Sequence, residues 1–322
     1  MKKLKDQGFH NSGSIHSHSS IKFYEQILKA DDLVLGLLRN GLKLPFKNKH
    51  QQISTYFEPN NKSCIGHEKF LWETVVAWQE LGTVKEVFHP PLVINPLSVV
   101  EKYDSATKTI KLRPVIDMSR YINPLLQDFH VKLDDLTFSE PFLELNMWMC
   151  SFDITSMFHH LKLSEDETEY FGFCLTDRDG RRRYFVFNVL MFGVKVAVYI
   201  MDRLLKPVKE FLHTLGIFIG IYIDDGRILH KDKTAAWFSF LFVLNILQMS
   251  GWTIQWKKTS TTPVQRMLHQ GVITDTTSMR YFTPDYKLDF IENEGKKLIQ
   301  KFKLKSLVTA SEFASFLARL PP

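Results

Sequence analysis

The chain is poor in cysteine, and it lacks the motifs on which cysteine-based scaffolds depend. Its three cysteines, Cys64, Cys150 and Cys174, are odd in number and far apart, and no Cys-x-x-Cys pair occurs among them. This spacing argues against a disulfide framework and against a cysteine-rich zinc site. We therefore expect a reducing environment, inside the cell, in the cytoplasm or the nucleus.

Long hydrophobic runs are also missing. Residues 1–20 are rich in Ser, His and Gly and contain no apolar segment of the signal-peptide type, so we expect a loose polar arm there. The longest apolar stretch, WFSFLFVLNILQM at residues 237–249, is too short to cross a bilayer and fits a buried helix better. The sequence thus predicts no membrane association.

The chain does contain enough apolar material for a sizeable core, together with a small basic excess. Hydrophobic residues make up 44% of the 322 positions, and 26 residues are Phe, which excludes global disorder. The formal net charge is +6. A basic excess of this size permits a polyanionic partner such as nucleic acid without requiring one.

The succession of periodic segments predicts an α+β fold with an antiparallel sheet. A helical pattern dominates residues 21–86, and two strands joined by a polar turn near residues 104–108 follow it. Further strands are expected at residues 147–152, 251–256, 271–275 and 279–284, and helices at residues 196–215, 234–250 and from 309 onward. Two hairpins are expected at residues 170–190, around Asp179-Gly180, and at residues 216–229.

Two adjacent aspartates interrupt the apolar pattern of the second hairpin. Asp224 and Asp225 lie in GIYIDDGRIL, where neighbouring ionised carboxylates repel each other and lose hydration. We predict that Asp225-Gly226 forms a tight turn, which places both carboxylates at the tip of the hairpin. Asp153 closes another apolar strand and is the expected third carboxylate. Such oxygen ligands select Mg²⁺ or Mn²⁺ and suit two-metal phosphoryl transfer, whereas each motif alone also fits an ordinary turn or helix-cap aspartate.

With these motifs in this order, the chain resembles a reverse transcriptase, an RNA-directed DNA polymerase, from about residue 31 to residue 322, and most closely the retrotransposon branch of gypsy and DIRS elements. The resemblance implies RNA and DNA template-primer and deoxynucleoside triphosphates as partners. It implies two Mg²⁺ ions, for which Mn²⁺ can substitute. It also implies a larger polyprotein with RNase H, integrase or recombinase regions.

The resemblance further implies the layout of a right-hand polymerase. An N-terminal helical extension at residues 21–86 would precede the fingers, which would comprise residues 87–148 and 164–187. The palm would comprise residues 149–163 and 188–280, and the thumb would begin at residues 281–322.

The catalytic residues follow from two family motifs and one further segment. Asp153, in FDITSMFHHLKL, and Asp224, in YIDD, would bridge the metal ions, with Asp225 as an auxiliary ligand. Lys258, in GWTIQWKKTSTTP, would protonate the pyrophosphate leaving group, and the neighbouring Lys257 is the less favoured choice. Either lysine also fits an ordinary surface position.

Five residues are expected to bind the nucleotide. By the same resemblance, Lys102 and Arg113 of the fingers hairpin would contact the triphosphate, since both side chains suit phosphate oxygens; solvated strand charges are the alternative. Phe158 would act as a steric gate that excludes a 2′-hydroxyl, or it is a core residue. Phe192 and Gly193, in NVLMFGVKVAVY, would line the nucleotide and template pocket.

The chain departs from the family pattern at several of these motifs. Met157 stands where a small residue is common, Met191 and Val198 replace prolines, and Gln270 replaces a leucine. These changes leave the chemical groups intact and alter the expected shape of the pocket. The arginines at residues 181–183 would meet the template, or they form a solvated turn.

Two other functions remain as alternatives. A degenerate or domesticated copy would keep the fold and bind nucleic acid without catalysis, which the altered LMFG motif favours and the three aspartates oppose. A viral RNA-dependent RNA polymerase usually carries Gly-Asp-Asp in the hairpin, and Tyr-Ile-Asp-Asp together with Phe158 argues against it.

Overall fold

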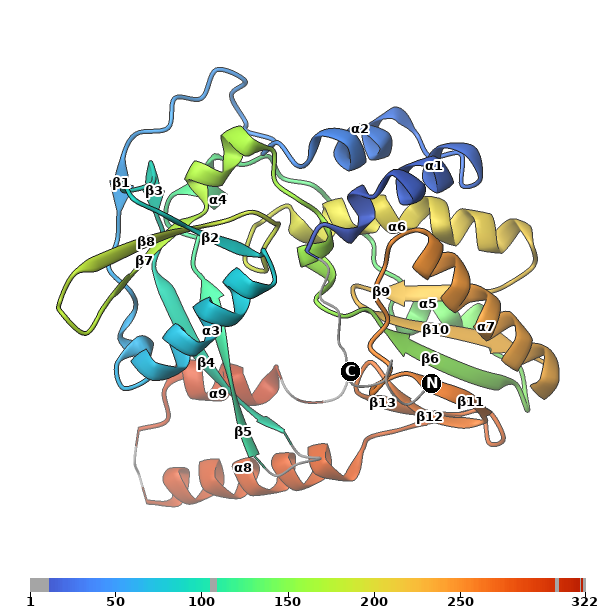
Figure 1. The fold of residues 1–322 in the computed structure, drawn as a ribbon. Helices are drawn as coiled ribbons and strands as arrows, with labels where there is room; N and C mark the ends of the chain where they lie inside the picture. The colour runs from blue at the N-terminus through green and yellow to red at the C-terminus, as the bar shows by residue number, and fades with distance from the viewer. Residues whose placement is uncertain (1–11, 105–108, 305–306, 319, 321–322) are drawn as a thin grey trace.

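The computed structural model describes residues 12–104, 109–304, 307–318 and 320, without the side chains of residues 103 and 104 (Figure 1). Helices and strands mix along the chain, and most strand pairs are antiparallel. The prediction of an α+β fold with antiparallel sheet is confirmed at this level. The boundaries proposed for fingers, palm and thumb stay predictions.

A four-stranded antiparallel sheet forms one half of the molecule (Figure 1). Its order is β11-β6-β10-β9, with β6 at Trp148–Asp153, β9 at Ile219–Tyr222, β10 at Asp225–His230 and β11 at Ser260–Val264. Two long helices pack against it, α6 (Ala197–Thr214) and α7 (Lys233–Met249). These elements confirm the strand predicted at residues 147–152, the second hairpin and both helices.

Helix α7 shows why the longest apolar run becomes a buried helix. The Asp232 carboxylate accepts a hydrogen bond from the Ala235 amide at 2.7 Å, which caps the first turn. Buried side chains then recur three or four positions apart, the spacing of one helix face, at Ala236, Phe240, Val243, Leu244 and Leu247. Among the helices that the structure describes, none combines the length and the apolar character needed to cross a membrane.

A five-stranded sheet forms the other half, and it corrects the prediction of a purely helical stretch at residues 21–86. Its order is β1-β3-β7-β8-β2, with β1 at Tyr56–Phe57, β2 at Val84–Val87, β3 at Val93–Ile94, β7 at Gly172–Thr176 and β8 at Arg182–Phe187. Strand β1 lies within the stretch predicted as helical, and β2 begins within it. They are too short for a two-residue alternation to be visible, so the pattern of α3 (Glu68–Glu80) dominated the prediction.

The N-terminal residues that the structure describes are not a loose arm, which corrects a second prediction. A 3₁₀ turn, η2 (Ser14–His16), leads into α1 (His18–Gln26), and Ile15 is fully buried. Helix α2 (Asp32–Asn40) follows. The polar composition of this segment misled the prediction, because Ser12, Ser14 and His16 bond to distant parts of the protein. Residues 1–11 lie outside the described residues.

One predicted turn and one predicted strand also differ. Strand β7 joins β8 through residues 177–181, so Asp179-Gly180 is part of a longer connection, in which the Asp177 carboxylate accepts hydrogen bonds from the Asp179 and Arg181 amides. The stretch 251–256 contains an isolated bridge between Ile254 and Ile154 and no strand.

The remaining elements surround these two sheets. Strands β4 (Leu97–Asp104) and β5 (Thr109–Ile116) form the predicted hairpin, whose turn residues 105–108 lie outside the described residues. A three-stranded sheet contains β12 (Arg266–His269), β13 (Val272–Asp275) and β14 (Arg280–Phe282), of which the last two were predicted. The helical elements not yet placed are η3 (Lys62–Cys64), α4 (Ile122–Leu125), α5 (Leu136–Ser139), η4 (Glu140–Phe142), η5 (Met157–His160), η6 (Glu165–Tyr170), α8 (Asp285–Lys303) and α9 (Ala310–Leu317).

Candidate active site

Two strand ends bring the predicted aspartates together. Asp153, the last residue of β6, lies directly opposite Asp225, the first residue of β10, in the antiparallel register. Directly opposed residues point to the same face of a sheet, so the two carboxylates are neighbours. Asp224 lies one residue before β10, and its carbonyl oxygen accepts a hydrogen bond from the Ile154 amide at 2.8 Å. Residues about 70 positions apart in the sequence therefore share one site.

The turn that carries Asp224 is shifted from its predicted position. Tyr222 pairs with Asp225, so the two turn residues are Ile223 and Asp224, and not Asp225 and Gly226. Ile223 adopts the positive φ of 56° that such a turn needs. This backbone conformation is strained for a β-branched side chain, and it persists because Ile223 packs against the main core.

Gly226 is needed for a different reason than a turn. It lies inside β10 opposite Phe152, and a Cβ atom built on it would come within 2.0 Å of the Phe152 ring. Phe152 is itself fully buried and cannot move aside freely. The Asp-Gly pair thus reflects close packing of an aromatic ring over the strand, immediately behind the carboxylates.

Burial makes the negative charge of this site costly. Burial is the largest cause that raises the pKa of Asp225 to about 6, followed by repulsion from Asp224 and Asp153. Burial likewise raises the pKa of Asp153, while a hydrogen bond from Lys258 opposes that rise. The site therefore favours a positive charge beside the carboxylates.

Lys258 supplies such a charge. Its ammonium donates a hydrogen bond to Asp153 Oδ2 at 2.6 Å, while 63% of the lysine side chain stays exposed. Within the part of the chain that the structure describes, the adjacent Lys257 forms no such ion pair, so the geometry favours Lys258 of the two candidates. An exposed ammonium anchored at a buried carboxylate can reach both the acid and a solvent-side ligand.

The three aspartate carboxylates suit a hard divalent cation in their chemistry, although they are not arranged around one. Across the described residues, no group of three or more His, Cys, Asp or Glu side chains is gathered closely enough to hold a metal ion as it stands. The chemistry of the three aspartates nevertheless fits Mg²⁺ or Mn²⁺, because carboxylate oxygens are their preferred ligands and two of these carboxyls have pKa values raised by burial and mutual repulsion.

Three of the residues predicted to bind nucleotide lie close together. The ring of Phe158, in η5, lies 5.8 Å from the ring of Phe192, which is 61% exposed. Gly193 has a φ of 104°, and a Cβ atom there would come within 2.8 Å of the Ile116 carbonyl oxygen. The close approach that requires this glycine is therefore to the end of β5, and the expected approach to a ligand remains a prediction.

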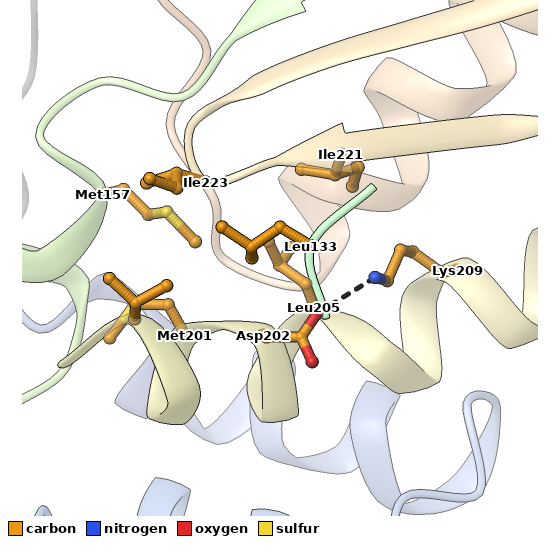
Figure 2. A pocket seen from close by; sticks show the side chains of 9 residues that line it. Leu133, Met157, Met201, Asp202, Leu205, Lys209, Ile221 and Ile223 are labelled. Carbon is orange, nitrogen blue, oxygen red and sulfur yellow. Dashed lines mark hydrogen bonds and ion pairs between the residues drawn. The ribbon is translucent and has the colours of Figure 1, made fainter. Parts of the chain in front are cut away.

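Two of the residues that depart from the family pattern lie close to the same pocket. Met157 and Val198 both line a small pocket beneath the Ile223 turn, together with Met201 of α6. Figure 2 shows the Met157 side chain pointing into this pocket below Ile223. The larger Met157 and the Val198 that replaces a proline thus line the same pocket.

At the far side of the same pocket an ion-pair network holds β9. Lys209 donates to Asp202 at 3.0 Å, the pair joined by a dashed line in Figure 2, and to Asp134 at 3.1 Å. Asp134 also accepts the Ile221 amide at 3.0 Å. The strand that leads into the aspartate turn is therefore tied to α6.

Comparison with known proteins identifies the family. A family model described as reverse transcriptase (RNA-dependent DNA polymerase) matches residues 107–282, more than half of the chain. The chain belongs to the reverse transcriptase family. Members of this family are RNA-directed DNA polymerases, a class of nucleotidyltransferase, and act on nucleic-acid template-primer and deoxynucleoside triphosphates. No curated protein matches the chain.

The match to the reverse transcriptase model begins after Lys102. The β4–β5 hairpin nevertheless places Lys102 and Arg113, the two residues predicted to contact phosphate, side by side on one face. Lys102 pairs with Lys111 and Val100 pairs with Arg113, so alternation along the strands places Lys102 and Arg113 on one face of the hairpin. Both side chains are exposed. They lie on a separate sheet from the aspartates, and contact with a nucleotide remains a prediction.

The arginine run of the reverse transcriptase is only partly directed to solvent. Arg183 forms a two-pronged ion pair with Glu86 of β2, and the Arg182 guanidinium lies 4.8 Å from the centre of the Phe57 ring. Both contacts join β8 to other strands of its own sheet, β2 through Glu86 and β1 through Phe57. The expected template contact of residues 181–183 therefore centres on Arg181.

Sequence reasoning missed several residues that organise the site. Tyr24 and Trp252 bond to each other, and His160 bonds to the Thr253 amide in the loop before Lys258, across 228 and 93 positions and without any shared motif. Arg227, two positions after Asp225, is 3% exposed and donates to Ser139 and Thr274. A charged residue inside the apolar pattern of β10 was the visible signal for the latter.

Proposed function

We propose that this chain is an active reverse transcriptase of a retroelement, which adds deoxynucleotides to a primer 3′-hydroxyl. The observation that supports this proposal is the meeting of Asp153, Asp224 and Asp225 at two strand ends, with the Lys258 ammonium bonded to Asp153. In a chain of this family, such a cluster is the chemistry that phosphoryl transfer needs: fixed negative ligands and a mobile proton donor.

The three aspartates would hold Mg²⁺ ions, with Mn²⁺ as a substitute. When bound, the ions would lower the pKa of the primer 3′-hydroxyl and neutralise the triphosphate charge. The contribution of the chain is positional: the β6–β10 register fixes Asp153 against Asp225, and the strained turn fixes Asp224. Bound cations would also relieve the repulsion that raises the Asp225 pKa.

Lys258 would donate its proton to the pyrophosphate leaving group. Its long, exposed side chain can turn from Asp153 towards a bound triphosphate without moving the backbone. Lys102 and Arg113, on one face of the β4–β5 hairpin, would bind the phosphates from the opposite side. Phe158 and Phe192 would pack against the sugar and base of the incoming nucleotide.

The catalytically inactive alternative is opposed by the way the departures are packed. Met157 and Val198 line one pocket behind the Ile223 turn, and all three aspartates are retained. A chain that kept only nucleic-acid binding would have no need for the Lys258–Asp153 pair or for a strained turn. We therefore favour catalysis over a binding module.

A primer-extension assay with Asp224→Asn tests the proposal. The substitution keeps the size of the side chain and removes its charge, so extension should fall by about a thousandfold or more, while the folded state and template-primer affinity stay near those of the unmodified chain. Asp32→Asn, which changes an exposed acid on α2, is the matched control. Extension by Asp224→Asn at the unmodified rate would remove Asp224 from the proposed role, and no extension by the unmodified chain with Mg²⁺ or Mn²⁺ would favour the binding module.

Phe158→Ala tests the sugar specificity that separates a DNA polymerase from an RNA polymerase. Removing the ring opens space beside the sugar, so the ratio of ribonucleotide to deoxynucleotide incorporation should rise by about tenfold or more. Phe142→Ala, which removes an exposed ring away from η5, is the control. An unchanged ratio would show that Phe158 is not the gate.

A further inference from the structure

The loop that carries Lys258 has little regular structure, so its position depends on individual contacts. Residues 251–258 follow α7 and contain no strand. On one side the loop is tied to the end of β6: the Gln255 amide donates to the Asp153 carbonyl oxygen at 2.8 Å, and the Thr155 amide donates to the Thr253 carbonyl oxygen at 2.8 Å. These bonds place the loop beside Asp153, yet they involve only its middle part.

The start of the loop is held by the N-terminal segment, which lies outside the family match. The Ser14 hydroxyl donates to the Gly251 carbonyl oxygen at 2.6 Å. The Tyr24 hydroxyl accepts a hydrogen bond from Trp252 Nε1 at 3.0 Å and donates one to the Leu204 carbonyl oxygen of α6 at 3.0 Å. Tyr24 therefore joins the loop to α6 through a single oxygen atom.

These contacts are buried and closely packed. Tyr24 is fully buried and Trp252 is 2% exposed, so neither polar group has water as an alternative partner. Gly251 has a φ of 89°, and a Cβ atom on it would lie 2.8 Å from the Ile15 Cα atom. Loss of the Tyr24 hydroxyl would leave the buried Trp252 N–H without its partner, which is the costly way to remove a buried hydrogen bond.

The same segment also holds the residues that follow Asp153. The Gly13 amide donates to the His159 carbonyl oxygen at 2.9 Å, and His16 Nε2 accepts the Lys162 amide at 2.8 Å. His160 completes the connection, since its Nε2 accepts the Thr253 amide at 3.0 Å and its ring lies 5.1 Å from that of Trp252. The N-terminal segment thus contacts both the residues that follow Asp153 and the loop that carries Lys258.

We propose that residues 13–24 form a brace that positions the Lys258 loop, with Tyr24 as its central positioning residue. Tyr24 touches no substrate in this arrangement and acts only through Trp252. The inference rests on the role proposed for Lys258 and extends it. The segment would therefore be a working part of the polymerase, although it precedes the matched region.

A purely stabilising role for this segment makes a different prediction. If it only covered apolar surface, Tyr24→Phe would lower the melting temperature and leave the rate of the folded enzyme unchanged. A brace predicts a slower chemical step in protein that is still folded. Because it acts through Lys258, it also predicts that the two residues are energetically coupled.

Single-turnover nucleotide addition with Tyr24→Phe, Lys258→Ala and the double variant tests this coupling. Tyr24→Phe should lower the maximal rate by about tenfold and leave the KM for deoxynucleotide within about twofold. In the Lys258→Ala background the same change should have no further effect. Tyr121→Phe, which removes a hydroxyl bonded to Ser54, is the matched control and should leave the rate unchanged. Equal losses in both backgrounds would overturn the proposal.

Hydrogen–deuterium exchange of the substrate-free protein provides a readout that does not depend on activity. Tyr24→Phe should speed exchange in peptides that cover residues 251–258, and Tyr121→Phe should not. Unchanged exchange in that loop would also overturn the brace. If the unmodified chain extends no primer, the proposed function fails, and exchange still decides the brace. Trp252→Phe, which removes the donor in place of the acceptor, is the second variant should Tyr24→Phe not fold.

Discussion

The four-stranded sheet and the two C-terminal helices are organised in opposite ways. In the sheet, Met149, Cys150 and Phe152 of β6 are fully buried, and the aspartates extend from this rigid base. Helices α8 and α9 contain no buried residue at all. Their ion pairs, such as Lys296–Glu292 and Lys301–Glu312, are exposed and contribute little to stability. The aspartates thus extend from a closely packed base, whereas α8 and α9 bury none of their residues.

This contrast suggests a division of labour. A site that must hold several like charges within bonding distance needs a backbone that cannot relax, because relaxation would separate the charges. A surface that follows a nucleic-acid duplex of variable sequence gains from loosely constrained elements whose contacts are mainly electrostatic. Three predictions test how far the contrast extends.

The same substitution should have opposite effects in the two regions. Gly226→Ala places a methyl group against the buried Phe152 ring and should lower the free energy of unfolding by about 3 kcal/mol or more. Gly295→Ala lies inside α8, with its nearest neighbour 3.8 Å away, and should raise that free energy by roughly 0.5–1 kcal/mol. Urea unfolding of both variants measures the difference. Similar values for the two would show that the sheet is less tightly packed than this contrast requires.

The N-terminal brace is buried and closely packed, as the sheet is. Its contribution to stability should depend on pH. Burial lowers the pKa of His16 to about 4, and the Lys162 charge adds to the effect, while the hydrogen bond to the Leu38 carbonyl opposes it. Between about pH 6.5 and pH 4 the unfolded chain binds the extra proton, so acidification through this window should cost about 2 kcal/mol of stability.

Denaturant unfolding at pH 7 and at pH 4 isolates this contribution. His16→Gln, which cannot be protonated, should lose that part of the pH dependence, whereas His18→Gln changes an exposed side chain and serves as the control. Identical pH profiles for His16→Gln and the unmodified chain would show that His16 is not held neutral.

Two arginines of residues 181–183 should respond differently to substitution, because Arg183 is paired within the protein whereas Arg181 is expected to contact nucleic acid. Arg181→Ala should reduce the slope of log affinity for template-primer against log salt by about one. Arg183→Ala should change that slope much less, since its charge is already matched by Glu86. Filter binding across a range of salt concentrations measures both. Equal slopes for the two variants would mean that Glu86 releases Arg183 when nucleic acid binds.

The sequence pattern predicted an element correctly wherever that element depends on residues that are neighbours along the chain. The buried spacing of α7 and the two apolar strands that end in aspartates were readable from residue order, because apolar periodicity and strand-ending acids are properties of neighbouring residues. The short strands β1 and β2 were not readable, since their stability comes from partners up to more than 100 positions away. The strand predicted at residues 251–256 did not form: Trp252 is buried and bonded to Tyr24 of α1, Ile254 makes only an isolated bridge with Ile154, and Trp256 is exposed.

The sequence by itself determined that three carboxylates interrupt or close apolar segments, and hence which chemistry is available. Only the tertiary structure decided how they meet. The register of β6 on β10 placed Asp153 opposite Asp225, the packing of Ile223 moved the turn by two residues, and Tyr24 joined a distant segment to the Lys258 loop. Residue type and spacing are encoded along the chain, whereas register, strain and buried hydrogen bonds depend on which surfaces pack against each other once the chain has folded.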